Sequence, residues 1–180
     1  MLFQKRISHF FYNLILSQIV LNHELQNDPI MYYINMNDKQ HIGIEFFKPT
    51  DVGPRNWGRE ILIAHVPGLY TGKLLIYNKG AKGGVQKHHL KNECGYVYSG
   101  KMLVRYDEGD GKLKEKILMP GDALHIPPGA VHQEEALEET VVFETSTPHF
   151  NDRVRMESEY GQEIPEGGLP STTIDQVETR

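Results

Sequence analysis

The chain has 180 residues, a formal net charge of -5, 39% hydrophobic residues and 24% charged residues. This length is typical of one domain, and the composition is typical of a globular protein, which excludes collagen-like and low-complexity classes. The negative net charge does not supply the positive field of a nucleic-acid-binding protein, so we expect no nucleic-acid partner. The single cysteine, Cys94, cannot form an intramolecular disulfide, which favours a cytoplasmic location.

The first 40 residues are expected to precede the folded domain. Residues 1–22 contain an apolar stretch that follows two basic residues and is interrupted by polar ones. The stretch is shorter than the roughly 20 residues that a membrane-spanning helix needs, and no small-residue cleavage site follows it. We therefore interpret residues 1–40 as an N-terminal extension, either helical or dispensable, and we expect no membrane association.

Short segments rich in β-branched and aromatic residues follow one another between turn residues. They are 61–66, 73–78, 94–99, 101–107, 112–118, 123–127 and 140–146. Strands at such short spacing leave no room for crossover helices, so the sequence predicts an all-β domain of mainly antiparallel strands over residues 41–162. The acidic run 134–139 is expected to be a solvated face or a hairpin edge. Residues 163–180 lack apolar periodicity and are predicted to be a flexible tail.

Two spaced motifs predict a metal site. The first is Gx5QxHx4Ex6G, with Gln86, His88 and Glu93 as its polar members, and the second is Gx5PxGx2H, which ends at His132. Choosing His89 in place of His88 would put a lysine at the first ligand position, so His88 is favoured. Residues 86 and 88 share one face of a strand because side chains alternate with period two.

The four side chains offer two imidazole nitrogens, one carboxylate and one amide oxygen. This donor set favours Zn(II), while Fe, Mn, Co and Ni remain compatible with it. One or two coordination positions would stay open for water or substrate, as catalytic metal sites require.

The two motifs resemble those of the cupin superfamily, Gx5HxHx3,4Ex6G and Gx5PxGx2Hx3N. The chain departs from them at Gln86, which replaces a His, and at Ala136, which replaces the final Asn. The stretch from about 55 to 162 further resembles the cupin domain of type II, bifunctional mannose-6-phosphate isomerases. It departs from that family at Lys91, Cys94 and Gln133. The resemblance implies a jelly-roll barrel and, by analogy, a homodimer.

The resemblance also implies an activity and roles for three more residues. It implies a metal-dependent aldose–ketose isomerase of carbohydrate metabolism, with a small sugar or sugar phosphate as its ligand. Arg155 matches the family's arginine near the end of the domain, and we expect it to hold the phosphate with Lys73 as a second cation. Glu144, on an alternating strand, is the candidate acid/base residue. Two of these residues also have a structural interpretation, with Arg155 as a surface partner of Glu157 or Glu159 and Glu144 exposed at the barrel rim.

Two other functions compete with the isomerase. An Fe(II)-dependent cupin dioxygenase would consume oxygen, and Gln86 in place of His argues against it. A non-catalytic, sugar-binding or regulatory cupin would bind its ligand without turnover. The cupin fold is shared by proteins of many activities, so the fold alone does not distinguish among these three functions.

Overall fold

The computed structural model describes residues 43–44, 46–164, 166 and 168–179. The expected N-terminal extension, 1–40, lies outside the described residues. The chain divides into two units, Met1–Ile44 and Glu45–Arg180, and the second unit carries every described strand.

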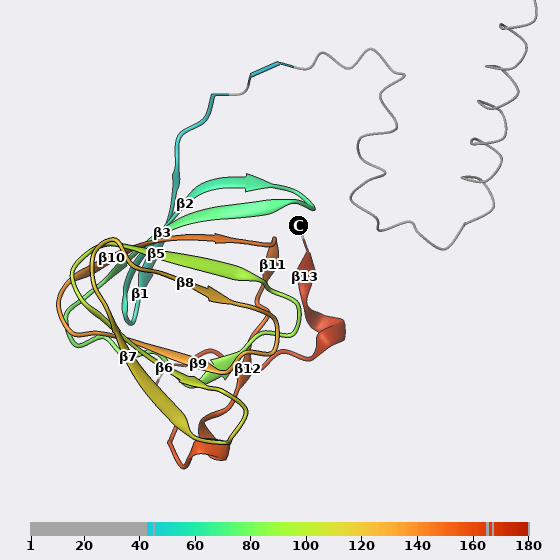
Figure 1. The fold of residues 1–180 in the computed structure, drawn as a ribbon. Helices are drawn as coiled ribbons and strands as arrows, with labels where there is room; N and C mark the ends of the chain where they lie inside the picture. Colours follow the sequence, from blue (N-terminus) through green and yellow to red (C-terminus); the bar gives the residue numbers. More distant parts are fainter. Residues whose placement is uncertain (1–42, 45, 165, 167, 180) are drawn as a thin grey trace, which may run out of the picture. The chain divides into compact units, whose positions relative to one another are not determined.

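Two large antiparallel sheets form most of the second unit. The six-stranded sheet has the order β1 (Thr50–Arg55), β2 (Gly58–Val66), β3 (Tyr70–Tyr77), β10 (Thr140–Ser146), β5 (Glu93–Ser99) and β8 (Ala123–Ile126). The five-stranded sheet has the order β12 (Val154–Arg155), β4 (Gln86–Lys87), β9 (His132–Ala136), β6 (Met102–Asp107) and β7 (Leu113–Leu118). Figure 1 shows the two sheets facing each other as the walls of a barrel. The prediction of an all-β, antiparallel jelly-roll domain is confirmed.

Helical structure is minor in the described part of the chain. It consists of two 3₁₀ turns, Glu157–Tyr160 and Ile174–Gln176. Among the residues that the structure describes, no helix has the length and apolarity needed to span a membrane.

Alternation along the strands builds the core at one end of the barrel. Leu75 of β3, Val142 of β10 and Val97 of β5 are cross-strand neighbours, and all three are buried. They belong to a larger apolar cluster that also contains Tyr77, Met102, Val104, Leu118 and Ala136. Each fully buried side chain of this size stabilises the fold by roughly 1.5–3 kcal/mol.

The same strands turn polar toward the other end of the barrel. Two residues beyond Val142, on the same face of β10, lies Glu144, which is paired with Lys73 of β3. Two residues further lies Ser146, which is paired with Glu93 of β5. The inward face of the six-stranded sheet therefore changes from an apolar core to a row of charged and hydroxyl groups, and the candidate site lies at this end.

The central strand β9 was not among the predicted strands. Its sequence, HQEEA, has no β-branched residue, which is why β propensity did not indicate it. The expectation of a solvated acidic run fails at its beginning, because Glu134 lies in β9 and points into the barrel cavity, whereas Glu138 and Glu139 are exposed. Glu134 can lie inside the barrel because the interior is polar at this end.

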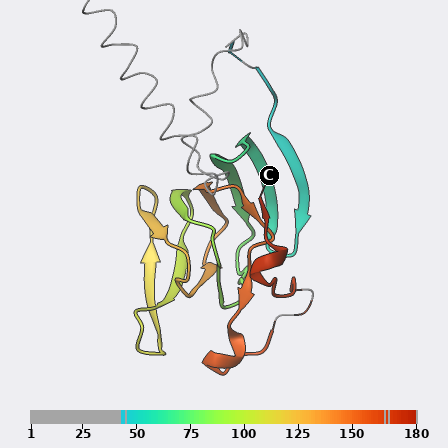
Figure 2. The ribbon, with the colours of Figure 1, turned by 90° about the vertical axis from the view of Figure 1, so that its right-hand side faces the viewer.

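The segment predicted to be a flexible tail is held against the barrel at several points. Its strand β13 (Glu178–Thr179) pairs with β11 (His149–Phe150). The backbone N–H of Thr172 donates to the carbonyl of Arg153 at 2.8 Å, and the Thr172 carbonyl accepts from His89 Nε2 at 2.8 Å. Figure 2 shows this segment in red beside the orange stretch that precedes it. Backbone and side-chain hydrogen bonds replace the apolar periodicity that the segment lacks.

Candidate metal centre

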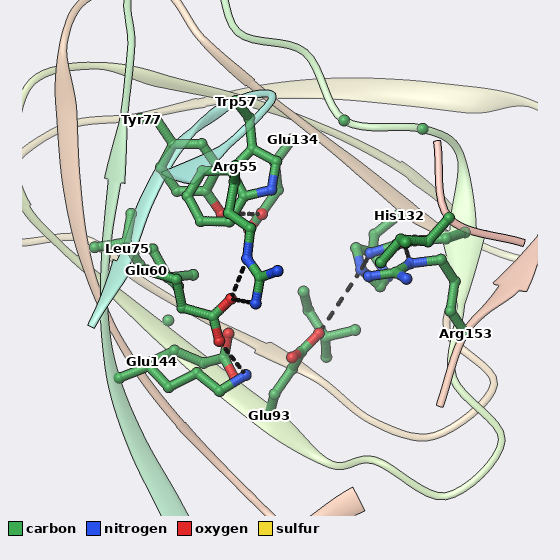
Figure 3. Close-up of a pocket in the computed structure, with 18 of the residues that line it drawn as sticks. Arg55, Trp57, Glu60, Leu75, Tyr77, Glu93, His132, Glu134, Glu144 and Arg153 are labelled. Carbon is green, nitrogen blue, oxygen red and sulfur yellow. Dashed lines mark hydrogen bonds and ion pairs between the residues drawn. The ribbon is translucent and has the colours of Figure 1, made fainter. Parts of the chain in front are cut away.

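A cavity of about 490 Å³ opens between the two sheets at the polar end of the barrel. Its wall contains all four predicted metal ligands and all three predicted catalytic residues. Figure 3 shows Glu93 and His132 on one side of the cavity and Glu60 and Glu144 on the other. Lys73 and Arg155, 82 positions apart in the sequence, therefore meet in one space of the size that small-molecule ligands occupy.

His88, Glu93 and His132 form a compact, buried triad. One donor atom from each lies within 4.8 Å of the other two. His88 Nε2 is 3.3 Å from Glu93 Oε1, and His132 Nε2 is 3.7 Å from the same oxygen. The two imidazole nitrogens thus converge on one carboxylate oxygen, and the three donor atoms lie close enough together to hold one divalent cation.

Each histidine is anchored through its other nitrogen. His88 Nδ1 donates to the backbone carbonyl of Asp152, and His132 Nδ1 donates to the carbonyl of Ala130 at 3.1 Å. A carbonyl can only accept, so both Nδ1 atoms carry a proton, and in the neutral imidazole Nε2 then keeps a lone pair that faces the centre. Hydrogen bonds of this kind orient histidine ligands in metal sites.

Electrostatics keeps His132 and Glu93 in the protonation states that metal binding needs. Burial lowers the pKa of His132 to about 4, so its imidazole is neutral at physiological pH. Burial opposes ionisation of Glu93, but the charge of the Lys91 ammonium beside it outweighs this effect and holds the pKa of Glu93 well below its usual range. A neutral imidazole and an ionised carboxylate are the ligand forms of these side chains.

These residues fit a divalent metal ion of the Zn(II) class. Two neutral imidazoles and one carboxylate are the protein ligands of one type of catalytic zinc site. Three protein ligands leave a coordination position for water or substrate, which the adjoining cavity could supply.

Gln86 lies beside the triad with its amide nitrogen, rather than its oxygen, toward the histidine. Nε2 is 3.3 Å from His132 Nε2, and Oε1 accepts a hydrogen bond from Arg153 Nε at 2.7 Å. The guanidinium has no acceptor atom, so this contact fixes the amide orientation. The sequence predicts that Gln86 binds a metal through its amide oxygen. In the structure that oxygen instead accepts the hydrogen bond from Arg153.

Glu144 and Lys73 take part in a chain of ion pairs that reaches Glu93. Lys91 Nζ contacts Glu93 Oε2 and lies 3.0 Å from Glu144 Oε1. Lys73 Nζ lies 3.6 Å from Glu144 Oε1 and 3.2 Å from Glu60 Oε1. Because Glu144 is buried and faces the cavity, the alternative of an exposed position at the barrel rim does not apply.

Arg155 has a carboxylate partner within the chain. Its guanidinium forms an ion pair with Glu157, and the two side chains are only 9% and 1% exposed. Gly84 allows the pair to come close, since a Cβ atom at residue 84 would overlap both Glu157 Oε1 and the Arg155 guanidinium. The expected partnership with a nearby glutamate is therefore present, although it is buried rather than on the surface.

Sequence reasoning gave no role in the site to four residues that the structure places there: Lys91, Glu134, Asp152 and Arg153. A signal was available for Glu134, because it lies two residues after His132 and period-two alternation puts both on one face. Its carboxyl accepts a hydrogen bond from the Tyr77 hydroxyl at 2.8 Å, and burial together with the nearby Glu93 charge raises its pKa to about 7. Asp152 and Arg153 lie in a connection with no local pattern, more than 60 residues from their partners.

Comparisons with known proteins agree with the motif analysis. Residues 73–145 match the family described as "Cupin domain". The chain is 36% identical over 86 residues to an oxalate decarboxylase of Arthroderma benhamiae, covering 46% of this chain and 20% of that protein. It is 38% identical over 72 residues to germin-like protein subfamily T member 3 of Arabidopsis thaliana, covering 38% and 32%. The chain thus spans no more than about a third of these two relatives.

Solved structures include two with a partial likeness in fold. KdgF from Halomonas sp. is 28% identical with a TM-score of 0.46, over 56% of this chain and 86% of that one. The capsular polysaccharide assembling protein CapF from Staphylococcus aureus is 23% identical with a TM-score of 0.48, over 56% and 28%.

Proposed function

The chain belongs to the cupin superfamily through its cupin domain at residues 73–145, and from this premise we propose that it is a metal-dependent isomerase. It would interconvert the aldose and ketose forms of a sugar or sugar phosphate. The observation that supports this most directly is the position of Lys91, whose ammonium touches both Glu93 and Glu144. A candidate acid/base carboxylate thereby lies one side chain away from the metal triad.

The metal, for which zinc is our proposal, would be held by His88, Glu93 and His132. When bound, such an ion polarises a substrate carbonyl and makes the neighbouring C–H more acidic. The triad would fix where that carbonyl lies relative to the cavity wall.

Glu144 would move the proton between the two neighbouring carbons. Its Oε1 accepts a hydrogen bond from Ser146 Oγ at 3.1 Å and lies between the ammonium groups of Lys73 and Lys91. These contacts hold the carboxylate in one orientation, and a positioned base contributes about 10²- to 10⁴-fold to such reactions. Lys73, which is already paired with Glu60 and Glu144, would help to orient Glu144.

Solvent exchange tests the proposal directly. The zinc-loaded protein is incubated in D₂O with mannose 6-phosphate, fructose 6-phosphate or a free pentose, and deuterium incorporation is followed by NMR. We expect exchange with wild type and a loss of at least about 100-fold with Glu144→Gln. Glu139→Gln, which alters an exposed glutamate just before β10, should exchange normally.

Absence of exchange with stoichiometric zinc on all of these substrates would overturn the isomerase. Calorimetric binding of the same sugars without exchange would replace it with the sugar-binding, non-catalytic function. Oxygen uptake by the iron-loaded protein would replace it with the dioxygenase.

A further inference from the structure

Arg153 is a cation of the cavity wall that lies directly beside the candidate metal centre. It precedes β12, its side chain is partly buried, and its guanidinium lines the cavity. Nε donates to Gln86 Oε1 at 2.7 Å, and the Gln86 amide nitrogen is 3.3 Å from His132 Nε2. Figure 3 shows Arg153 reaching toward His132. One amide group therefore separates the guanidinium from a triad histidine.

Arg153 differs from the other arginines of the cavity wall, Arg55 and Arg155, in its partners. Arg55 is paired with Glu60, and Arg155 is paired with Glu157. For Arg153, no carboxylate lies within 4.0 Å among the residues that the structure describes. Burial and the positive charge of Arg155 lower the pKa of Arg153, which means that its surroundings disfavour the charged form.

An arginine in this situation is suited to an external anion. Desolvating a cation is costly unless a charge of opposite sign compensates it. Only Nε is engaged by Gln86, so the guanidinium can still present N–H groups to two oxygens of one carboxylate or phosphate.

From this geometry we propose that Arg153 binds the anionic group of the ligand, a carboxylate or a phosphate monoester, and that Gln86 positions Arg153 instead of coordinating the metal. The inference deepens the proposed function and rests on it for the rest of the ligand. The ligand would place a carbonyl or hydroxyl oxygen at the triad and its anionic group against Arg153. Arg155, with its charge compensated by Glu157, would not take this role.

Calorimetry with matched ligands tests the role of Arg153. Zinc-loaded wild type, Arg153→Met and Arg153→Lys are each titrated with fructose 6-phosphate, with glucuronate and with uncharged fructose. We expect Arg153→Met to weaken binding of one charged ligand by roughly 10- to 100-fold while fructose binding changes less than about threefold. Arg153→Lys should recover part of the loss, because it keeps the charge but not the planar fork. The charged ligand whose binding is weakened shows whether Arg153 binds a phosphate or a carboxylate.

A matched control separates this effect from a general change in charge. Lys82→Met removes one positive charge from an exposed residue of the same cavity wall and should leave the three affinities within about threefold. The Arg153 proposal is overturned if wild type binds neither anionic ligand better than fructose. Equal losses for charged and uncharged ligands in Arg153→Met would overturn it as well.

A second measurement tests the role of Gln86. Zinc affinity is determined by competition with a chelating dye for wild type and Gln86→Leu. We expect zinc affinity within about threefold of wild type and anion binding weakened about 10-fold, because Arg153 loses its partner. A loss of zinc affinity beyond about 100-fold would instead show that Gln86 is a ligand.

The two proposals can fail separately. Selective anion binding that depends on Arg153, without deuterium exchange, would leave the inference standing and remove the isomerase. Exchange that persists while Arg153→Met binds charged and uncharged ligands as wild type does would leave the isomerase and remove the inference.

Discussion

The ammonium of Lys91 donates a hydrogen bond to Oε2 of Glu93, and the opposite oxygen, Oε1, is the one that faces the two triad histidines. The lysine therefore fixes which carboxylate oxygen is offered to a metal. It also compensates a charge that burial alone would disfavour. Because Lys91 precedes Glu93 by two residues, one short loop supplies both the ligand and the group that orients it.

We expect Lys91→Met to destabilise the metal-free protein by about 3 kcal/mol or more at neutral pH. Removing the ammonium leaves the carboxylates of Glu93 and Glu144 buried without their shared cation, and breaking a buried pair from one side typically costs about 3–5 kcal/mol. Urea unfolding followed by circular dichroism measures the change. Lys116→Met, on an exposed position of β7, should cost less than about 0.5 kcal/mol. Equal stability of Lys91→Met and wild type would contradict the ion-pair chain.

Asp152 organises the loop that carries His88 and Lys91. Its carboxylate accepts backbone hydrogen bonds from His89, Leu90 and Lys91 at 2.8, 2.7 and 2.6 Å. An asparagine amide cannot accept all three, so we expect Asp152→Asn to lower the free energy of unfolding by about 2 kcal/mol. It should also weaken zinc binding about 10-fold, since the Asp152 carbonyl holds His88.

The control for this change is Asp122→Asn. Asp122 caps an exposed turn with one hydrogen bond, from the N–H of Met119, and its replacement should cost less than about 1 kcal/mol. If both variants lost the same stability and zinc affinity, Asp152 would have no special role in the loop.

Local pattern was sufficient to predict much of the fold. Strand β10 was predicted with its observed bounds because Val141, Val142 and Phe143 combine β propensity with alternation. Strand β9 was missed because its residues have no such propensity and are used for their polar groups. A strand of this kind is defined by its place between β4 and β6, which no local window contains.

The candidate site was likewise predicted only in part from the local sequence. The spacing of the motifs indicated His88, Glu93 and His132, and the structure brings these three together. The groups that hold them come from distant segments, as with the Asp152 carbonyl that accepts from His88 across 64 positions. The spacing of a motif predicts the candidate ligands of a site. The residues that orient those ligands are set by tertiary packing, which the motif does not contain.

We expect zinc binding to depend on His132 of the triad and not on a histidine outside the triad. Wild type should bind one zinc ion per chain, and His132→Ala should weaken binding by more than about 100-fold, since even residues that only orient ligands contribute 10- to 100-fold. His125→Ala removes a histidine that is exposed and bonded to Asn92, and it should bind as wild type does. Elemental analysis and dye competition measure both variants. Normal zinc affinity in His132→Ala would exclude the triad as the binding site.

Glu60 gives the domain a pH-dependent contribution to stability. It lies between Arg55 of β1, which donates at 3.0 Å, and Lys73 of β3, whose Nζ is 3.2 Å away and also faces Glu144. Burial would raise the pKa of Glu60, but the Lys73 charge and the hydrogen bonds from both partners outweigh this and hold the pKa below its ordinary value of 4.5.

A folded-state pKa below the unfolded one stabilises the protein at higher pH, where the carboxylate is ionised in both states. That stabilisation is lost as the pH falls from about 4.5 through the folded-state pKa. We therefore expect Glu60→Gln to be less stable than wild type by about 1–2 kcal/mol at neutral pH, with the difference shrinking as the pH falls below about 4.5. Urea unfolding across this range measures it, and Glu108→Gln, which breaks the exposed pair with Lys114, should show little difference at any pH. A Glu60→Gln deficit that stayed constant down to low pH would mean that packing, not charge, accounts for the role of Glu60.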